Sequence, residues 1–382
     1  MIPLAEPVLA GNEWRYIKEC LDTGWVSSVG SFVNRFEEEM AKYLGVAHGV
    51  AVVNGTAALH LSLIIAGVKK DDIVLVPTLT FIAPVNTVRY VGAYPVFFDC
   101  DPETLCLDVN QIAQFLSREC ERRGDGMAYY KKTGQRVGAV IPVNALGHPA
   151  DMDALMEVCR QYKVCVIEDA TESLGSEYKG KKAGALGNIG CLSFNGNKII
   201  TTGGGGMLVT NNGEWAARVR HLSTQAKKDP LRYDHDEIGY NYRLTNIQAA
   251  LGVAQLEKLE EYVTRKREIA ARYRELFAGI GGKLKVLQEA SWAKSNYWLS
   301  TIQVDPNAKE PLMQYLIDQG IQARPIWNLI HELPMYKGGN VYGESTPHAL
   351  HAWQTCLNIP CSVNITNDQI ETVAGAIKNY FS

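Results

Sequence analysis

The chain has 382 residues, 46% of them hydrophobic and 21% charged, which is enough to bury a large core and suggests two unequal domains. A formal net charge of −3 supplies no basic field for nucleic acid, and no segment approaches the roughly 18 uninterrupted apolar residues of a membrane span. The nine cysteines form no C-x-x-C pair and no clustered His and Cys spacing resembles a metal site, so we expect reduced cysteines, no metal, and a cytoplasmic protein without nucleic-acid or membrane partners.

Apolar runs alternate with helix-length segments in the first half of the chain. This rhythm is typical of βαβ units and predicts a mostly parallel sheet. The expected strands are residues 50–53, 73–76, 96–98, 137–143 and 164–167, and the expected helices are residues 57–66, 108–116 and 151–162.

The first expected strand leads directly into a candidate anion site. Asn54, Gly55 and Thr56 follow the strand, and a helix is expected to begin at Ala57. A helix N-terminus presents free backbone N–H groups and the positive end of a dipole, so phosphate binds readily there. A plain strand-to-helix turn capped by Asn54 or Thr56 explains the same residues without any ligand.

A carboxylate and a lysine follow in the middle of the chain. Residues 164–169 read as a buried parallel strand that ends at Asp169, where open α/β sheets place functional groups. Lys198 lies between the strand-like residues 191–194 and a turn of four glycines, 203–206, where a side chain can face a cleft. A lysine that can form a Schiff base and an acid that can hold a pyridinium nitrogen protonated are what pyridoxal phosphate requires. A solvated lysine and a helix-capping acid are the alternatives.

Two further side chains could contact such a cofactor. Ser193, shortly before Lys198, could add a hydroxyl to the phosphate site. Phe81 follows the second expected strand and could place an aromatic face against the cofactor ring, although a core aromatic is the default reading.

Other phosphate-binding motifs are excluded by their context. Residues 175–182 match the spacing G-x-x-x-x-G-K but lack the following Ser or Thr and lie in an expected hairpin turn, so they do not form a P-loop. The four glycines 203–206 are too uniform for a dinucleotide fingerprint. They predict close backbone approach and unusual dihedral angles near the cofactor.

The second half of the chain carries weaker signals. Short pieces around residues 176–178, 190–194 and 207–210 are expected to complete the large sheet before a helix near Glu214. One long amphipathic helix is expected from Asn246 to about Leu276. We therefore expect a large domain at residues 1–250, and a bridging helix with a small domain at residues 251–382 that contains a strand at 297–304 and helices at 311–319 and after residue 367.

Together these segments resemble the DegT/DnrJ/StrS family of sugar aminotransferases, whose fold is the aspartate-aminotransferase-like fold type I of pyridoxal-phosphate enzymes. The resemblance covers nearly the full chain and implies an α/β fold, with a large mostly parallel sheet domain and a smaller α+β C-terminal domain. The segments that carry it are residues 54–59, 77–81, 149–153, 168–170, 193–202 and 239–244.

The resemblance also implies roles for individual residues. Lys198 would form the Schiff base, Asp169 would pair with the pyridine nitrogen, and Phe81 would stack on the ring. Asn241 would reach the phosphate across a homodimer interface, so that the two subunits share their sites. The remaining cofactor contacts would come from Gly55, Thr56, Ala57, Glu172 and Ser193.

Two positions depart from the common pattern of the family. Many relatives carry Gln or His at Glu172, and a carboxylate there would repel the phenolic oxygen of the cofactor. Glu172 is either protonated by burial or turned towards the incoming amine or a water molecule. Asn144 replaces a frequent histidine, so contacts of that histidine are not transferred.

The resemblance implies a reaction in two halves. L-Glutamate would convert the cofactor to pyridoxamine phosphate, which then aminates a nucleotide-linked keto sugar. Residues 24–30 and 194–200 most resemble enzymes that aminate C4 of UDP-4-keto-6-deoxy-N-acetylglucosamine for surface glycans or glycoproteins. dTDP- or GDP-linked sugars are alternatives, and a pyridoxamine-dependent dehydratase or a non-catalytic regulator is less favoured.

Four residues are candidate substrate contacts. Ser27, Ser28 and His331 could contact the sugar nucleotide, although surface-loop polarity explains each of them more simply. Arg243, beside Asn241, could equally face the substrate or be structural.

Overall fold

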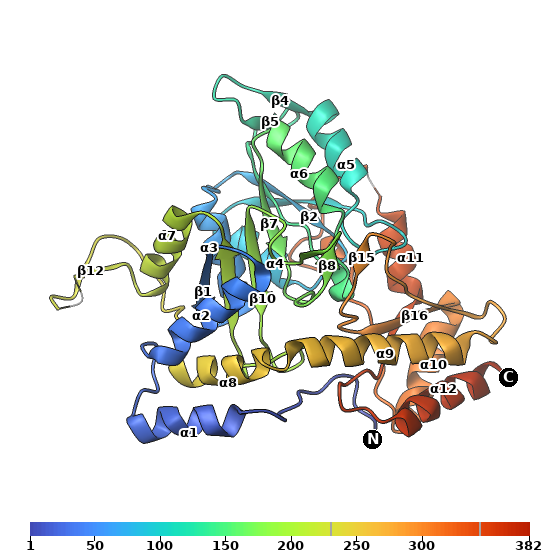
Figure 1. Ribbon diagram of the computed structural model, residues 1–382. Helices are drawn as coiled ribbons and strands as arrows, with labels where there is room; N and C mark the ends of the chain where they lie inside the picture. The colour runs from blue at the N-terminus through green and yellow to red at the C-terminus, as the bar shows by residue number, and fades with distance from the viewer. Residues whose placement is uncertain (230, 344) are drawn as a thin grey trace.

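An eight-stranded sheet forms the centre of the computed structural model, which describes residues 1–229, 231–343 and 345–382 (Figure 1). The strand order is β1-β11-β10-β7-β6-β2-β3-β18. Neighbouring strands are parallel except at β11, which is antiparallel to both β1 and β10. The strands are β1 (His48–Val52), β2 (Ile73–Pro77), β3 (Tyr94–Phe98), β6 (Val137–Val140), β7 (Cys165–Asp169), β10 (Ile189–Ser193), β11 (Gly206–Thr210) and β18 (Asn340–Val341).

Helices cover both faces of this sheet, which explains why its strands read as almost continuous apolar runs. One face packs against α3 (Gly55–Ile65), α4 (Ala83–Tyr90) and α7 (Gly213–Ser223). The other face packs against α5 (Val109–Gln114), α6 (Met152–Gln161), α1 (Glu13–Thr23), α2 (Ser31–Leu44) and α8 (Asn246–Leu256).

A smaller sheet follows in the last third of the chain. Its order is β14-β16-β19-β17, and every pairing is antiparallel. Its core includes side chains of α9 (Leu259–Phe277), α10 (Pro306–Asp318) and α12 (Asn367–Phe381). The strands are β14 (Leu284–Val286), β16 (Ser300–Val304), β17 (Arg324–Pro325) and β19 (Cys356–Ile359), and α11 (Pro347–Thr355) lies against the core of the large sheet.

Short elements occupy the connections. Two of them are small two-stranded sheets, β4 with β5 and β12 with β13, and the β12 hairpin projects from the rest of the molecule (Figure 1). The bounds are β4 (Cys120–Arg122), β5 (Ala128–Tyr130), β12 (Lys227–Asp229), β13 (Asp234–His235), a π-helix at Phe115–Glu119 and 3-10 turns at Ala145–Gly147 and Ile330–Glu332.

The expected α/β architecture is confirmed, but two expected elements are wrong. Residues 176–178 do not join the large sheet, because the turn at Lys179 and Gly180, with φ of 48° and 79°, reverses the chain at once. The strand there, β8 (Glu177–Tyr178), pairs instead with β9 (Lys181–Lys182) and β15 (Ala293–Lys294). The single helix expected from residue 246 is divided into α8 and α9.

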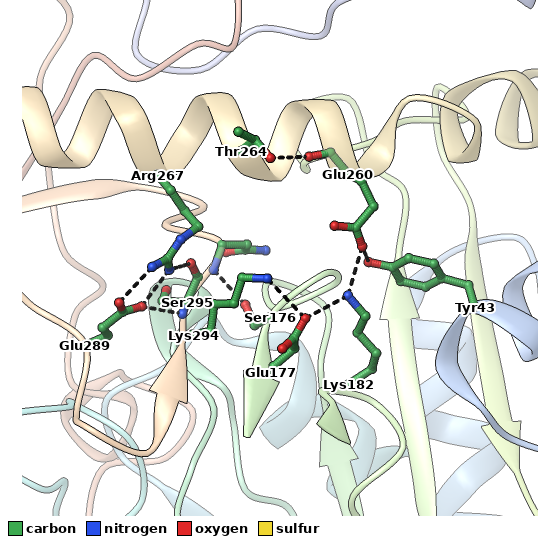
Figure 2. A network of polar contacts seen from close by, with 11 residues as sticks. Tyr43, Ser176, Glu177, Lys182, Glu260, Thr264, Arg267, Glu289, Lys294 and Ser295 are labelled. Carbon is green, nitrogen blue, oxygen red and sulfur yellow. Dashed lines mark hydrogen bonds and ion pairs between the residues drawn. The ribbon is translucent and has the colours of Figure 1, made fainter. Parts of the chain in front are cut away.

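Polar contacts fasten α9 to this three-stranded sheet (Figure 2). Lys182 on β9 places Nζ 2.8 Å from Glu260 Oε1 on α9 and 3.1 Å from Glu177 Oε1. Arg267 on the same helix forms a two-pronged ion pair with Glu289, at 2.6 and 2.9 Å. The segment that precedes β16 is therefore attached to α9 through fixed side chains.

All nine cysteines are free thiols; Cys165 is half-buried and the others are buried. Among the described residues, no helix combines the length and the apolar character needed to cross a membrane. The domain boundary at residue 250 stays a prediction.

Candidate active site

A cleft of about 710 Å³ opens where the carboxyl ends of β1, β2, β7 and β10 meet. Parallel sheets gather functional groups at this edge, and here the smaller sheet closes the cleft from the other side. The large domain lines the cleft with residues at or just after the ends of these strands. They are Asn54, Gly55, Thr56, Thr80, Phe81, Asp169, Thr171, Glu172, Ser193, Asn195, Asn197 and Lys198. The opposite wall includes Leu4, Ala5, Trp298, Gln322, Arg324, Trp327 and Asn358.

The predicted lysine and acid lie in this cleft together. Lys198 follows β10, and Asp169 ends the neighbouring strand β7. The Lys198 side chain is only 13% exposed, and burial lowers its pKa. Asp169 is 2% exposed, and burial raises its pKa, opposed by a hydrogen bond from the Thr171 backbone N–H to Oδ1 at 3.1 Å. A lysine whose pKa is lowered by burial and an acid held out of water thus face one space.

Glu172 lies beside the lysine, and its carboxyl group is also buried. Its Oε1 is 3.8 Å from Lys198 Nζ, and its Oε2 accepts a hydrogen bond from the Leu146 backbone N–H at 2.9 Å. Burial raises the pKa of Glu172 to about 7, against the opposing effect of Lys198. The raised pKa is in the direction of the first expected behaviour, protonation by burial, while the carboxyl group lies beside the lysine amine.

The turn after β1 forms a cradle for an anion. The Asn54 side chain caps α3 by accepting from the Ala57 N–H at 2.7 Å, so that amide is occupied and Ala57 lies outside the cleft lining. Gly55 and Thr56 line the cleft, and the first turn of a helix leaves its N–H groups without intrahelical acceptors. A Cβ on Gly55 would lie 3.0 Å from that of Ser193, so only glycine fits without displacement.

The glycine turn after Lys198 also behaves as expected. Gly203 and Gly205 adopt positive φ values of 79° and 139°. A Cβ on Gly206 would lie 2.4 Å from the Asn54 backbone carbon, so β11 can approach the cradle only with glycine there.

These residues fit pyridoxal phosphate. The cradle offers amides for a phosphate, the half-buried Ser193 lines the same space, and the 54% exposed Phe81 offers a ring at its edge. Thr80 Oγ1 is buried and finds no partner among the described residues, which leaves a hydroxyl available to a ligand. Asp169 supplies the single acid that a cationic ring nitrogen needs.

Two of the predicted substrate contacts lie outside the cleft lining. Arg243 Nη1 is 2.5 Å from Glu37 Oε1; Glu37 is buried and the Arg243 side chain is 11% exposed, which fits the structural alternative for Arg243. His331 Nδ1 is 2.5 Å from Thr78 Oγ1, behind the loop that carries Phe81.

The other predicted contacts are also separated from the cleft of their own chain. The Ser27 carbonyl accepts from the Asn246 N–H at 2.6 Å, and neither Ser27 nor Ser28 lines the cleft. Asn241 is exposed and forms an isolated bridge with Thr224. An exposed position is compatible with a contact to a partner subunit.

Sequence reasoning missed the wall formed by the smaller sheet. Trp298 Nε1 donates to the Asn197 carbonyl at 2.7 Å, and Lys198 Nζ lies 4.0 Å from the centre of the Trp298 ring. Arg324, on β17, forms no ion pair among the described residues. Nothing local marks Trp298, because it stands in an apolar, strand-like pattern where a core aromatic is expected.

Comparisons with known proteins agree with this geometry. The profile of the DegT/DnrJ/EryC1/StrS aminotransferase family matches residues 7–378. The GDP-perosamine synthases of Escherichia coli O157:H7 and Vibrio cholerae are 38% and 37% identical, covering 100% of this chain and 99% and 100% of the relatives. The aminotransferase TlmJ from Streptoalloteichus hindustanus superposes with a TM-score of 0.90 at 28% identity, covering 100% of this chain and 98% of that one. The chain therefore belongs to the DegT/DnrJ/EryC1/StrS family of aminotransferases, which are pyridoxal-phosphate-dependent enzymes.

Proposed function

We propose that this enzyme moves an amino group from L-glutamate to the C4 keto group of a GDP-linked 4-keto-6-deoxy sugar, for surface glycan synthesis. One observation carries the proposal, namely that Lys198 and Asp169 line the same cleft as the amides of Gly55 and Thr56. The choice of nucleotide is supported by the name GDP-perosamine synthase, which two relatives of 38% and 37% identity share. It replaces UDP, which the sequence motifs favour, as the first candidate.

The cleft residues would hold the cofactor in defined roles. Asp169 would pair with the pyridine nitrogen, and Lys198 would form the covalent link. The amides of Gly55 and Thr56 and the hydroxyl of Ser193 would bind the phosphate, with Phe81 against the ring. When bound, pyridoxal phosphate supplies the electron-withdrawing ring that makes it easier to remove a proton from the carbon that carries the amine.

The protein itself would move the proton. Lys198 Nζ takes a proton from the carbon that bears the amine of L-glutamate, and it returns a proton to sugar C4 in the second half of the reaction. This requires a neutral amine, and burial lowers the pKa of Lys198 in that direction. Glu172, 3.8 Å away, can hold a proton near neutral pH.

Arg324 would bind the anionic groups of the substrates. It lines the cleft opposite Lys198 and is exposed. A guanidinium group binds a carboxylate or a phosphate through paired hydrogen bonds. L-Glutamate and a nucleotide diphosphate both carry such a group, so one arginine could serve both halves of the reaction.

The enzyme would act as a homodimer with shared sites. Asn241 follows a projecting hairpin on which Leu231, Tyr233 and Ile238 are 90%, 78% and 85% exposed. Exposed apolar side chains grouped on one projection are typical of a surface that a partner covers. Asn241 would then reach the phosphate of the neighbouring subunit.

Product analysis tests the proposal. The enzyme is incubated with pyridoxal phosphate, L-glutamate and either GDP-4-keto-6-deoxymannose or UDP-4-keto-6-deoxy-N-acetylglucosamine, and mass spectrometry detects the amino sugar and 2-oxoglutarate. We expect conversion of the GDP sugar, no conversion by Lys198→Ala, and unchanged conversion by Lys70→Ala, which removes an exposed lysine.

The outcomes separate the parts of the proposal. Conversion of the UDP sugar alone would overturn the choice of nucleotide and leave the reaction type in place. Activity of Lys198→Ala equal to the wild type would overturn the role of the lysine. If neither sugar reacts and L-glutamate is not consumed, the proposed reaction is wrong.

A further inference from the structure

The amine of Lys198 lies between an aromatic ring and a carboxyl group. Its Nζ is 4.0 Å from the centre of the Trp298 ring and 3.8 Å from Glu172 Oε1. Both neighbours are buried, and Trp298 is only 5% exposed. The face of an indole ring attracts an ammonium group, most strongly where water is excluded.

Three hydrogen bonds hold Trp298 in place. Its backbone N–H donates to Asn296 Oδ1 at 2.8 Å, and its carbonyl accepts from the buried Lys266 at 2.8 Å. Its indole N–H donates to the Asn197 carbonyl at 2.7 Å. The ring is therefore held beside the loop that carries Lys198, although Trp298 lies in the segment before β16 and Lys198 in the loop after β10.

The proposed reaction needs a place for this amine. The lysine would be displaced when the amino donor takes its place, and its amine would then have to stay near the reacting carbon through the second half. A free lysine side chain has several rotatable bonds, and holding it in one arrangement reduces the entropy cost of each proton transfer.

We infer that Trp298 is a positioning residue that holds the unlinked amine of Lys198 against its ring face between the two halves of the reaction. We rest this inference on the proposed function, because a reaction in two halves leaves the lysine unlinked while the second substrate binds and reacts. The contact is non-covalent, so no bond is formed or broken in this step.

The charges around the amine set the direction of the expected effect. Burial lowers the pKa of Lys198, while Glu172 and Asp169 raise it. The Trp298 ring also favours the charged amine. Where an apolar replacement keeps the amine out of water, removing the ring takes away this attraction alone, so the pKa of the unlinked amine should fall and its neutral, reactive fraction at a given pH should rise.

Chemical labelling of the pyridoxamine-phosphate form measures this effect. The full-length enzyme receives short pulses of acetic anhydride across a pH series, and mass spectrometry compares acetylation of Lys198 with that of the exposed Lys70. For Trp298→Leu we expect the labelling midpoint to fall by about half to one pH unit, roughly three- to tenfold faster labelling below the midpoint. Trp298→Phe keeps an aromatic face and should shift by less.

Two controls keep the test specific. Both Trp298 variants lose the hydrogen bond to Asn197, so equal shifts in the two would assign the effect to that bond and overturn the inference. Trp327→Leu removes another aromatic side chain of the cleft wall and should leave the midpoint unchanged.

The remaining outcomes are equally decisive. An unchanged or raised midpoint in Trp298→Leu would overturn the role of the ring, whichever sugar the enzyme uses. A wrong sugar affects only the product analysis and leaves the labelling result as predicted. Failure of the wild type to bind pyridoxamine phosphate would overturn both the inference and the proposed function.

Discussion

Asn296 donates from Nδ2 to the backbone carbonyl of Glu172 at 2.9 Å, although 124 residues separate the two along the chain. A second bond at 2.9 Å reaches the carbonyl of Leu174, and the Asn296 side chain is fully buried. The loop after β7, which carries Glu172, is thus held by the segment that precedes β16. One buried amide thus joins the segment before β16 to the loop that carries Glu172.

The variant Asn296→Ala should destabilise the protein by about 2 kcal/mol or more, because it leaves two buried carbonyl groups without donors. Urea unfolding of the cofactor-free protein measures the change. Asn364→Ala is the matched control, since it removes an exposed amide that bonds to Glu6, and it should cost much less. Equal losses in the two variants would contradict the role given to Asn296.

Substituting Arg243 distinguishes a structural role for this residue from a role as a substrate contact. Its ion pair with Glu37 is largely shielded from water, with side-chain exposures of 11% and 6%, and removing one partner of such a pair costs about 3 kcal/mol. Arg243→Met should therefore lower the thermal midpoint, with KM for the sugar nucleotide unchanged. Arg220→Met, which removes a more exposed partner of the same carboxylate at 3.1 Å, should lower it less. A raised KM at unchanged stability would make Arg243 a substrate contact.

Glu172 should make stability depend on pH. Burial raises its pKa from 4.5 to about 7, so the folded protein binds a proton that the unfolded chain has released between these values. Stability contributed by this residue must then fall as the pH rises through that window, by up to about 3 kcal/mol. Urea unfolding at pH 5 and pH 8 should show a smaller loss in Glu172→Gln than in the wild type.

A second carboxylate controls for general charge effects in that comparison. Glu38→Gln removes an exposed acid from α2 and should follow the wild-type pH profile. If Glu172→Gln also follows the wild type, then the Glu172 carboxyl group titrates alike in the folded and unfolded protein, and its proposed proton-holding role is lost.

Mixed dimers test the shared site. Asn241→Ala and Lys198→Ala subunits are each expected to be nearly inactive alone, because each lacks one half of the site. When they are mixed and exchanged, one of the two sites in each hybrid dimer is intact, and activity should return in part. Separate affinity tags on the two variants confirm that hybrids form. Hybrids that stay inactive would show that Asn241 does not act across the interface.

Much of the fold was readable from the sequence, because its signals are local. The strands ending at Pro77 and Asp169 are apolar runs buried on both faces, and the α3 start at Gly55 follows a capping residue. The carboxyl ends of parallel strands meet at one edge, so Asp169 and Lys198 could be predicted to share a cleft.

The errors arose where tertiary contacts decide the structure. The carboxylate of Glu257, at the break between α8 and α9, accepts hydrogen bonds from Tyr16 and Asn12, and no periodicity reports such contacts. His331 is polar and its neighbourhood resembles a loop, yet it bonds to Thr78 behind the cleft. Trp298 lies in the segment that precedes β16 of the smaller sheet, and only the packing of that segment against the large domain places it against Lys198.

The hydrogen bond from Trp298 to the Asn197 carbonyl has a practical consequence for engineering sugar choice. Exchanging the C-terminal third between relatives is an obvious way to graft one wall of the cleft, and with it a new specificity. In this chain such a chimaera would also replace the ring beside the reactive lysine. Grafts that begin after Trp298 would leave that ring and its bond to the lysine loop intact, and are the better starting point for redesign.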